Sequence, residues 1–150
     1  MKRLLFFVLF LPSFNSIAKV KNGLKESTPS DVVIPVTKTD VKILQKASKI
    51  LSSESKWNRD DNRECPMEAK SFSLYCAMNK ASIEVNGEFD HRLPAMEELR
   101  RSVEDFTKNK KYEHRLMGFN NDPSTTFADI KRILLLTEDR LSLRLRATTN

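Results

Sequence analysis

The residues with the most obvious chemical potential lie together at positions 119–126, in the stretch FNNDPSTT. These positions hold two amides, one carboxylate, one proline and three hydroxyls, directly before an apolar run. Thr126 and Asp129 fit a capping box, with Asp in place of the commoner Glu or Gln, and Asp122 with the following proline fits a turn. The cap leaves Asn120, Asn121 and Asp122 unexplained, and a ligand-binding loop is the alternative, because the N–H groups at a helix start attract anionic groups. Both hypotheses stay open at this point.

A pocket around this loop would need side chains from elsewhere in the chain. The candidate ligand-binding residues are Trp57, His114, Asn121 and Asp122, with Cys76 as a further member of the pocket. A buried Asp122 with a perturbed pKa in such a pocket would favour a ligand binder or an enzyme. An Asp122 that only bonds backbone N–H groups would favour a structural role.

The rest of the sequence carries no catalytic signature, so no catalytic residue, metal site or cofactor is predicted. His91 and His114 belong to neither a His-Glu-x-x-His nor a Cys-x-x-Cys spacing, which zinc sites commonly use. No serine lies in a Gly-x-Ser-x-Gly motif, and the three glycines do not form a phosphate-binding loop. Whether the protein is an enzyme is left uncertain, with the motifs favouring a non-enzymatic role.

Cys65 and Cys76 are the only cysteines, and an even number in an exported chain is compatible with a disulfide. On a single helix the two residues would stand about 16 Å apart, beyond the roughly 7 Å limit between bridged Cα atoms. A bond therefore requires Cys65 to lie in a loop that doubles back, before Pro66 starts a helix, or Cys76 to face that loop. A disulfide, two separate thiols and a metal or nucleophilic role all remain as hypotheses.

The first 18 residues read as a secretory signal peptide. Lys2 and Arg3 form a basic start, an apolar stretch follows, and Ser16-Ile17-Ala18 is a small-x-small cleavage site. The apolar stretch is shorter than the about 20 residues that a membrane span needs. We expect cleavage near Ala18, no transmembrane anchor afterwards, and a periplasmic or secreted protein. Residues 19–38 contain prolines, Ser, Thr and Gly without a helical period, which predicts an extended flexible leader.

The charge pattern does not suggest nucleic-acid binding. The net charge of the whole chain is +6, and removal of two basic residues with the signal peptide lowers it to +4. Basic and acidic residues are interleaved, as in EELRRSVEDFTKNKKYEHR, which is typical of solvated helix faces. A partner, if there is one, is expected to be another envelope or extracellular protein. The oligomeric state is not predicted.

The elements that must position these residues are predicted to be helices. The first starts near Asp40, with Thr39 or Asp40 as its cap, because apolar residues then recur at three- and four-residue steps. It ends at the polar stretch SSESKWNRDDNRE, whose Trp57 is expected to fold back over the core.

Prolines are placed to begin two further helices. Pro66 is predicted to open one that VNGE, at residues 85–88, stops, and Pro94 to open the next. The expected inward residues are Phe72, Tyr75, Cys76, Asn79 and Ile83 in the first of these, and Met96, Leu99, Val103 and Phe106 in the second. The residues expected to face outward in the second are Glu97, Glu98, Arg100 and Arg101.

The C-terminal part completes an all-α fold. NKKYEHRLMG predicts a short helix or turn closed by Gly118, and a last helix is expected from Thr126 through Leu145. The expected inward residues of the last helix are Ile130, Ile133, Leu134, Thr137 and Leu141. We therefore predict a small bundle of four main helices plus the short helix or turn, as a single helical domain over residues 39–150.

Trp57 in a polar loop, Cys76 followed by Ala77, and Asn121-Asp122 ahead of TFADI at residues 126–130 occur in an order that resembles a known family. This is a bacterial family of small helical proteins, domain of unknown function 6197. Its members show a late Trp-Asn-Asp…Thr-x-x-Glu-Val motif that opens the last helix.

The resemblance spans residues 40 to about 141 and has three departures. Asn120 stands where the family has an aromatic residue, Asn79 stands where a Gly is usual, and the gap between Asp122 and Thr126 is one residue short. The resemblance implies a helical architecture and no particular activity. The sequence therefore favours an exported, non-enzymatic structural or protein-interaction module, with a small-ligand binder or enzyme as the alternative.

Overall fold

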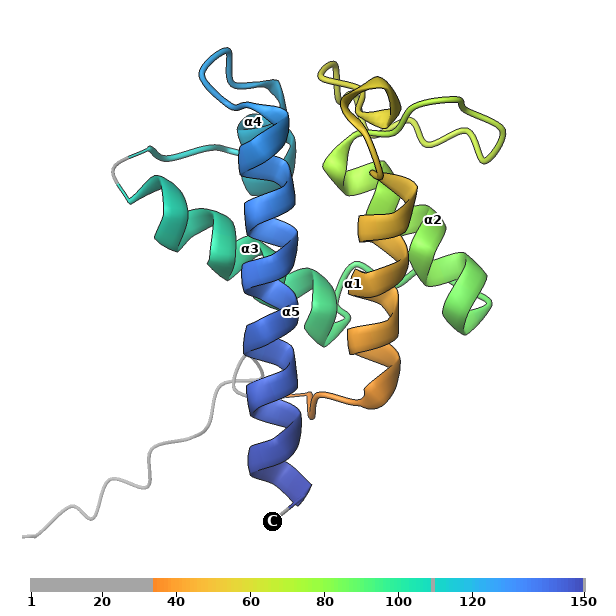
Figure 1. Cartoon of the computed structure of the whole chain (residues 1–150), viewed down its shortest axis with the longest axis vertical. Helices are drawn as coiled ribbons and strands as arrows, with labels where there is room; N and C mark the ends of the chain where they lie inside the picture. The colour runs from red at the N-terminus through yellow and green to blue at the C-terminus, as the bar shows by residue number, and fades with distance from the viewer. Residues whose placement is uncertain (1–33, 109, 150) are drawn as a thin grey trace, which may run out of the picture. The chain divides into compact units, whose positions relative to one another are not determined.

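The computed structural model describes residues 34–108 and 110–149, and in these ranges the chain forms five α-helices and no named strand (Figure 1). The signal peptide and most of the leader lie outside the described residues. The helices are α1 (Lys38–Ile50), α2 (Leu74–Asn86), α3 (Pro94–Thr107), α4 (Arg115–Asn121) and α5 (Phe127–Thr149), with one 3-10 turn at Glu54–Lys56. The predicted all-α class, with four longer helices and a short one, is confirmed.

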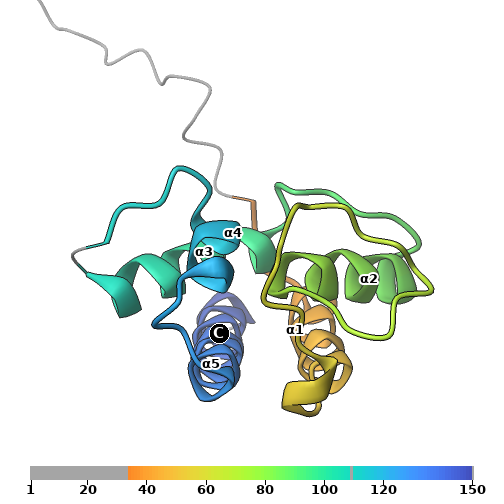
Figure 2. The ribbon, with the colours of Figure 1, turned by 90° about the horizontal axis from the view of Figure 1, so that it is seen from above.

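Helix α1 packs against both α2 and α5, and α3 packs against α5 and α4. Figure 2 shows α1 and α5 close to end-on, with α2 and α3 running across the view. The fully buried large side chains come from all five helices and the residue after α1: Ile43, Leu44, Leu51, Leu74, Met78, Met96, Leu99, Phe119, Ile130, Ile133, Leu134 and Leu141. One continuous apolar core therefore joins the helices.

Helix α1 begins earlier than predicted. Its cap is Thr37 rather than Thr39 or Asp40, and Asp40 instead completes the capping box by accepting the Thr37 N–H at 2.8 Å. The other carboxylate oxygen of Asp40 accepts the Ala95 N–H at 3.1 Å, at the start of α3. Asp40 is buried because it satisfies N–H groups of two helices at once. Val36 is also buried, so the last part of the predicted leader belongs to the core.

Helix α2 begins later than predicted. Pro66 lies in a turn, and the helix starts at Leu74, where the Ser73 hydroxyl accepts the Cys76 N–H at 3.1 Å. This start rotates the buried face onto Leu74, Cys76, Ala77, Met78, Ala81 and Ser82. Of the predicted inner residues, Phe72 and Cys76 are buried and Tyr75 packs against the core, whereas Asn79 and Ile83 are only partly buried. The helix ends at Gly87 in the left-handed conformation, within the predicted VNGE stop.

Helix α3 begins at Pro94 as predicted, and Met96, Leu99 and Val103 face the core. Glu98 is an exception to the predicted outward set. It is only 6% exposed and receives a hydrogen bond from Arg144 of α5 at 2.7 Å. The carboxylate can be buried because its charge is paired with an arginine from the neighbouring helix.

Gly118 lies inside α4 and does not close it, contrary to the prediction. A Cβ atom at this position would lie 2.6 Å from the Cβ of Tyr112, so the close approach of the Tyr112 side chain requires glycine. In α5 all five predicted inward residues are buried, from Ile130 to Leu141. The apolar period of this long helix was sufficient to place its inner face.

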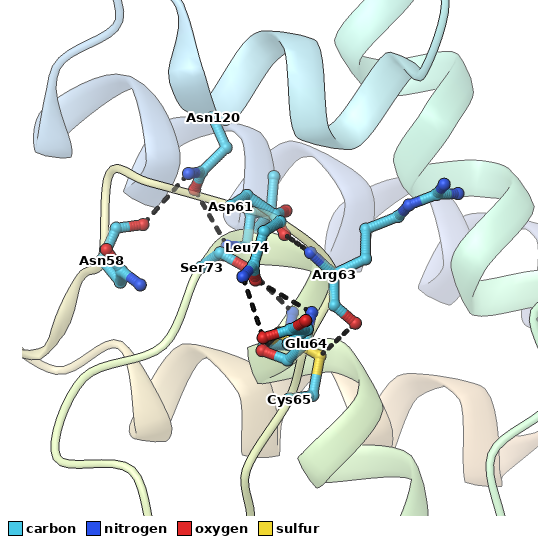
Figure 3. Close-up of a disulfide and its surroundings, with 10 residues drawn as sticks. Asn58, Asp61, Arg63, Glu64, Cys65, Ser73, Leu74 and Asn120 are labelled. Atoms are coloured by element: carbon cyan, nitrogen blue, oxygen red, sulfur yellow. Dashed lines mark hydrogen bonds between the residues drawn. A yellow bond between two sulfur atoms is a disulfide. The ribbon is translucent and has the colours of Figure 1, made fainter.

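A disulfide joins Cys65 and Cys76 and closes the loop that precedes α2 (Figure 3). The two Cα atoms lie 5.1 Å apart because Cys65 is in the loop, outside the helix that carries Cys76. Backbone hydrogen bonds from Asn58 N–H to Phe72 O and from Phe72 N–H to Lys56 O hold the two ends of the same loop together. The loop of residues 58–72 is thus restrained by the disulfide near its middle and by backbone hydrogen bonds at both ends.

Removal of the disulfide should destabilise the protein without changing its fold. The two cysteines are 11 positions apart in the sequence. Closing a loop of this size lowers the conformational entropy of the unfolded chain, which stabilises the folded state by about 3 kcal/mol. Urea unfolding should show a loss of about that size for the Cys65→Ala, Cys76→Ala double variant. Dithiothreitol should destabilise the wild type and leave the double variant unchanged. Equal stability of the wild type with and without reductant would contradict the expectation.

Candidate functional site

Asn120 is the centre of a buried hydrogen-bond network between α4, the loop before α2, and α2 itself (Figure 3). Its side-chain oxygen accepts the Trp57 indole N–H at 2.8 Å and the Leu74 N–H at 3.0 Å. Its amide nitrogen donates to Asn58 O at 3.0 Å and to the side-chain oxygen of Asn121 at 3.1 Å. The side chain is fully buried, and two donors and two acceptors use the capacity of the amide.

Asn121 extends the network to the backbone of Asp61. The Asn121 oxygen accepts the Asp61 N–H at 2.8 Å, and its amide nitrogen donates to Asp61 O at 2.9 Å. Arg59 adds hydrogen bonds to the carbonyl oxygens of Asp122 and Pro123, at 3.3 and 3.2 Å. The polar loop after α1 is thereby fixed to α4 and to the segment after it.

Asp122 binds four donors, none of which belongs to the Asn120 network. One oxygen accepts the Lys110 ammonium at 2.7 Å and the Tyr112 hydroxyl at 2.8 Å. The other accepts the Ser124 N–H at 2.9 Å and the Ser124 hydroxyl at 2.7 Å. The Lys110 hydrogen bond, and then those from Ser124 and Tyr112, hold the pKa of Asp122 far below its usual range.

Tyr112 is affected in the opposite direction. Burial first, and then the hydrogen bond to the Asp122 carboxylate, raise the pKa of Tyr112 to about 12. The phenol therefore stays protonated and donates to Asp122. Because the Tyr112 ring also lies against Gly118 of α4, this pair fastens the chain before α4 to the chain after it.

Thr126 and Asp129 form reciprocal hydrogen bonds at the start of α5. The Asp129 carboxylate accepts the Thr126 N–H at 2.9 Å, and the Thr126 hydroxyl accepts the Asp129 N–H at 3.2 Å. This is the geometry of a capping box. Asp122 with Ser124 forms the turn that precedes it, since the Thr125 N–H donates to Asp122 O at 2.9 Å.

The four candidate ligand-binding residues are put to different uses. Trp57 is buried, donates to Asn120 and packs against Phe127 with ring centroids 6.1 Å apart. Asn121 binds the Asp61 backbone, and Asp122 binds Lys110, Tyr112 and Ser124. His114 lines a separate hollow with Arg63, Tyr75, Glu113 and their neighbours. Cys76, the further member of the expected pocket, is in the disulfide.

Sequence reasoning did not single out Asn120, Tyr112 or Lys110 as site residues. Asn120 had a signal, since it lies beside Asn121 and occupies an aromatic position of the resembled family. Lys110 and Tyr112 had none, because their partner Asp122 is 10 or more residues away and only the path of the loop brings them together.

Within residues 34–108 and 110–149, no group of three or more His, Cys, Asp or Glu side chains is placed to hold a metal ion. In the same part of the chain no helix is both long and apolar enough to cross a membrane.

The fold and the network define a small all-α domain in which side-chain amides of α4 hold a disulfide-closed polar loop and the first residue of α2. The chain belongs to the family of unknown function DUF6197, whose model matches residues 35–140. The resemblance seen in the sequence is thereby confirmed, and the matched range contains the whole network. No curated protein and no solved structure matches the chain.

Asn120→Ala should be strongly destabilising. It leaves the Trp57 indole N–H and the Leu74 N–H without their acceptor in a buried environment, and each such group costs about 1–3 kcal/mol. We expect a total loss of about 3 kcal/mol or more in urea unfolding, followed by the fluorescence of Trp57, the only tryptophan. The matched variant Asn121→Ala, at an exposed position, should lose about 1 kcal/mol. A loss no larger for Asn120→Ala than for Asn121→Ala would contradict the central role of Asn120.

Asp122→Asn should reduce the stability of the protein at neutral pH and make that stability less dependent on pH in the acidic range. The folded-state pKa of Asp122 lies below the unfolded value of about 3.9, so the carboxylate stabilises the fold above that value. This contribution is lost as pH falls from about 5 through the lowered pKa. Thermal melts from pH 7 to pH 2 should show the wild-type advantage shrinking with acid. The exposed-site control Asp139→Asn should follow the wild type, and a variant difference independent of pH would contradict the assignment.

Proposed function

We propose that this protein is an exported, non-enzymatic helical module that serves a structural or protein-interaction role in the periplasm or outside the cell. The observation that carries the proposal is the internal use of the polar groups at residues 119–126. Asn120, Asn121, Asp122, Ser124 and Thr126 all bind partners in the same chain. Side chains committed in this way hold the fold and are poorly suited to contact a substrate.

Asp122 is also unsuited to acid–base catalysis. A general base works best with a pKa near the working pH, and enzymes raise carboxylate pKa values by burial to reach it. The pKa of Asp122 is shifted the other way, and its two oxygens already accept four donors. The arrangement supports a structural carboxylate.

The disulfide supports the export part of the proposal. Disulfides persist in oxidising environments such as the periplasm and the extracellular space, and are rare in the reducing cytosol. The basic and apolar N-terminal stretch provides the matching targeting signal in the sequence. We propose cleavage after Ala18 and an extended leader that connects to the helical domain.

The polar loop of residues 58–64 is the surface we propose for partner contact. Arg59, Asp60, Asn62, Arg63 and Glu64 are exposed, while the loop that carries them is held by the disulfide and by the Asn120 and Asn121 amides. A surface that is already ordered loses less conformational freedom on binding, which favours affinity.

The alternative is a small-ligand binder, and one observation favours it. A hollow of about 210 Å³ lies beside the segment between α4 and α5 and is lined by Lys110, Tyr112, Phe119, Ser124 and their neighbours. Three of its polar residues, Lys110, Tyr112 and Ser124, already bind Asp122, so a ligand there would compete with these internal hydrogen bonds.

In-cell photo-crosslinking can test the proposal. With a photoreactive residue at Asp60, we expect a discrete adduct with one envelope or extracellular protein, because the exposed loop is the contact surface. The matched control is the same residue at Asp139, exposed on α5, which should give no adduct. Mass spectrometry of the same sample should show a chain that begins at Lys19.

Two outcomes would contradict the proposal. An intact Met1 on mature protein would show that the leader is retained. Absence of any adduct at Asp60, together with a ligand-induced rise in melting temperature that Asp122→Asn abolishes, would favour the small-ligand alternative.

A further inference from the structure

A second hollow, of about 200 Å³, lies where the disulfide-closed loop, α2, α3 and the start of α4 meet. It contains an unusual concentration of cationic and hydrogen-bond-donating side chains. The residues that line it are Arg63, Tyr75, Arg100, Glu113, His114, Arg115, Leu116 and Met117. The lining therefore includes three arginines and one histidine but only one acidic residue, Glu113.

The donors of this hollow are only partly used within the protein. Arg100 binds Glu97 and His91 O through one terminal nitrogen, and Arg115 binds Glu104 through one. The side chains of Arg63 and His114 make no hydrogen bond or ion pair with any described residue. Arg63 thus contributes a charge without a carboxylate partner, next to two guanidiniums that keep unused N–H groups.

The position of Arg63 is set by the same devices that fix the loop. Its backbone has a positive φ of 62°, a conformation that non-glycine residues seldom adopt, and its N–H donates to the Asp61 carboxylate at 2.8 Å. Two residues later, Cys65 is bonded to Cys76, the neighbour of Tyr75 on α2. Figure 3 shows the Arg63 side chain extending away from the disulfide. The loop therefore fixes the backbone of Arg63 at the edge of the hollow that its side chain lines.

We propose that this hollow binds a single oxyanion group, a phosphate or a carboxylate, with Arg63 as its main ligand. The planar guanidinium fork matches the paired oxygens of such groups, and the unused N–H groups of Arg100 and Arg115 supply further donors. The hollow accommodates one small anion, carried by a free metabolite or by an acidic side chain of a peptide. This inference goes beyond the proposed function and does not rest on it.

An ordinary surface cluster of arginines is the competing explanation, and it predicts a different response to mutation. Screened surface charges would attract anions weakly and would lose a similar share of binding whichever arginine is neutralised. A built site would depend far more on the residue that contacts the anion.

The test is titration of the full oxidised chain with inorganic phosphate, followed by NMR, at constant ionic strength set with sodium chloride. We expect saturable shifts of the backbone amides around Arg63 and His114. Arg63→Gln removes the positive charge while keeping an unbranched, polar, non-glycine residue, and it should weaken binding about tenfold or more, because a charge-assisted contact is lost. The matched control Arg101→Gln removes the same charge one residue after Arg100, outside the hollow, and should change the affinity by less than about twofold.

A second arm uses a short polyglutamate peptide under the same conditions. Binding of phosphate supports a free-anion ligand, and binding of the peptide alone supports an acidic protein segment. Arg115→Gln provides a second variant if Arg63→Gln fails to fold, as judged by its amide spectrum. The proposal is overturned if neither probe saturates, or if the hollow variants and Arg101→Gln weaken binding equally.

Discussion

The structure depends most on one buried amide, the side chain of Asn120. Its oxygen accepts hydrogen bonds from the Trp57 indole N–H and the first N–H of α2, and its amide nitrogen donates to the carbonyl oxygen of Asn58. These three contacts come from segments 46 to 63 residues away along the chain. A fully buried polar group is tolerated only when its hydrogen-bonding capacity is used, and here it is used completely. The loop, the start of α2 and the end of α4 are thus joined through a single side chain.

Covalent and ionic contacts reinforce this arrangement in different ways. The Cys65–Cys76 disulfide limits the unfolded chain and keeps the loop close to α2, whereas the hydrogen bonds of Asn120 and Asn121 act only in the folded state. Asp122 and Lys110 tie the segments on either side of α4 together near the surface. Buried carboxylates serve the same purpose elsewhere, since Asp40 joins α1 to α3 and Glu98 joins α3 to α5. Polar contacts between helices therefore set the register of an otherwise apolar core.

The internal use of polar side chains limits which parts of the protein are available for binding. A polar loop rich in amides, carboxylates and hydroxyls has the composition of a binding site, but at residues 119–126 those groups are used to build the protein. The surfaces that we propose for contact with other molecules are the exposed loop at residues 58–64, which the network holds, and the arginine-lined hollow beside it. Family membership assigns no activity to the chain, because the family is itself of unknown function.

The sequence by itself determined the features that depend on local pattern. The period of α5 placed Ile130 to Leu141 in the core, Pro94 marked the start of α3, and Thr126 with Asp129 carried a recognisable capping pattern. Local pattern was insufficient wherever a contact from a distant segment decided the outcome. Pro66 was an acceptable first residue for a helix, yet α2 begins at Leu74, where Asn120 takes the backbone N–H. Glu98 was predicted to face solvent, but it is buried because it pairs with Arg144 of α5. Gly118 was predicted to end a helix, but it lies inside α4, where the close Tyr112 ring requires glycine. Only the tertiary structure could decide these cases, because the partners are far apart in the sequence and a side chain's choice between solvent and a buried partner depends on which groups the fold brings within reach.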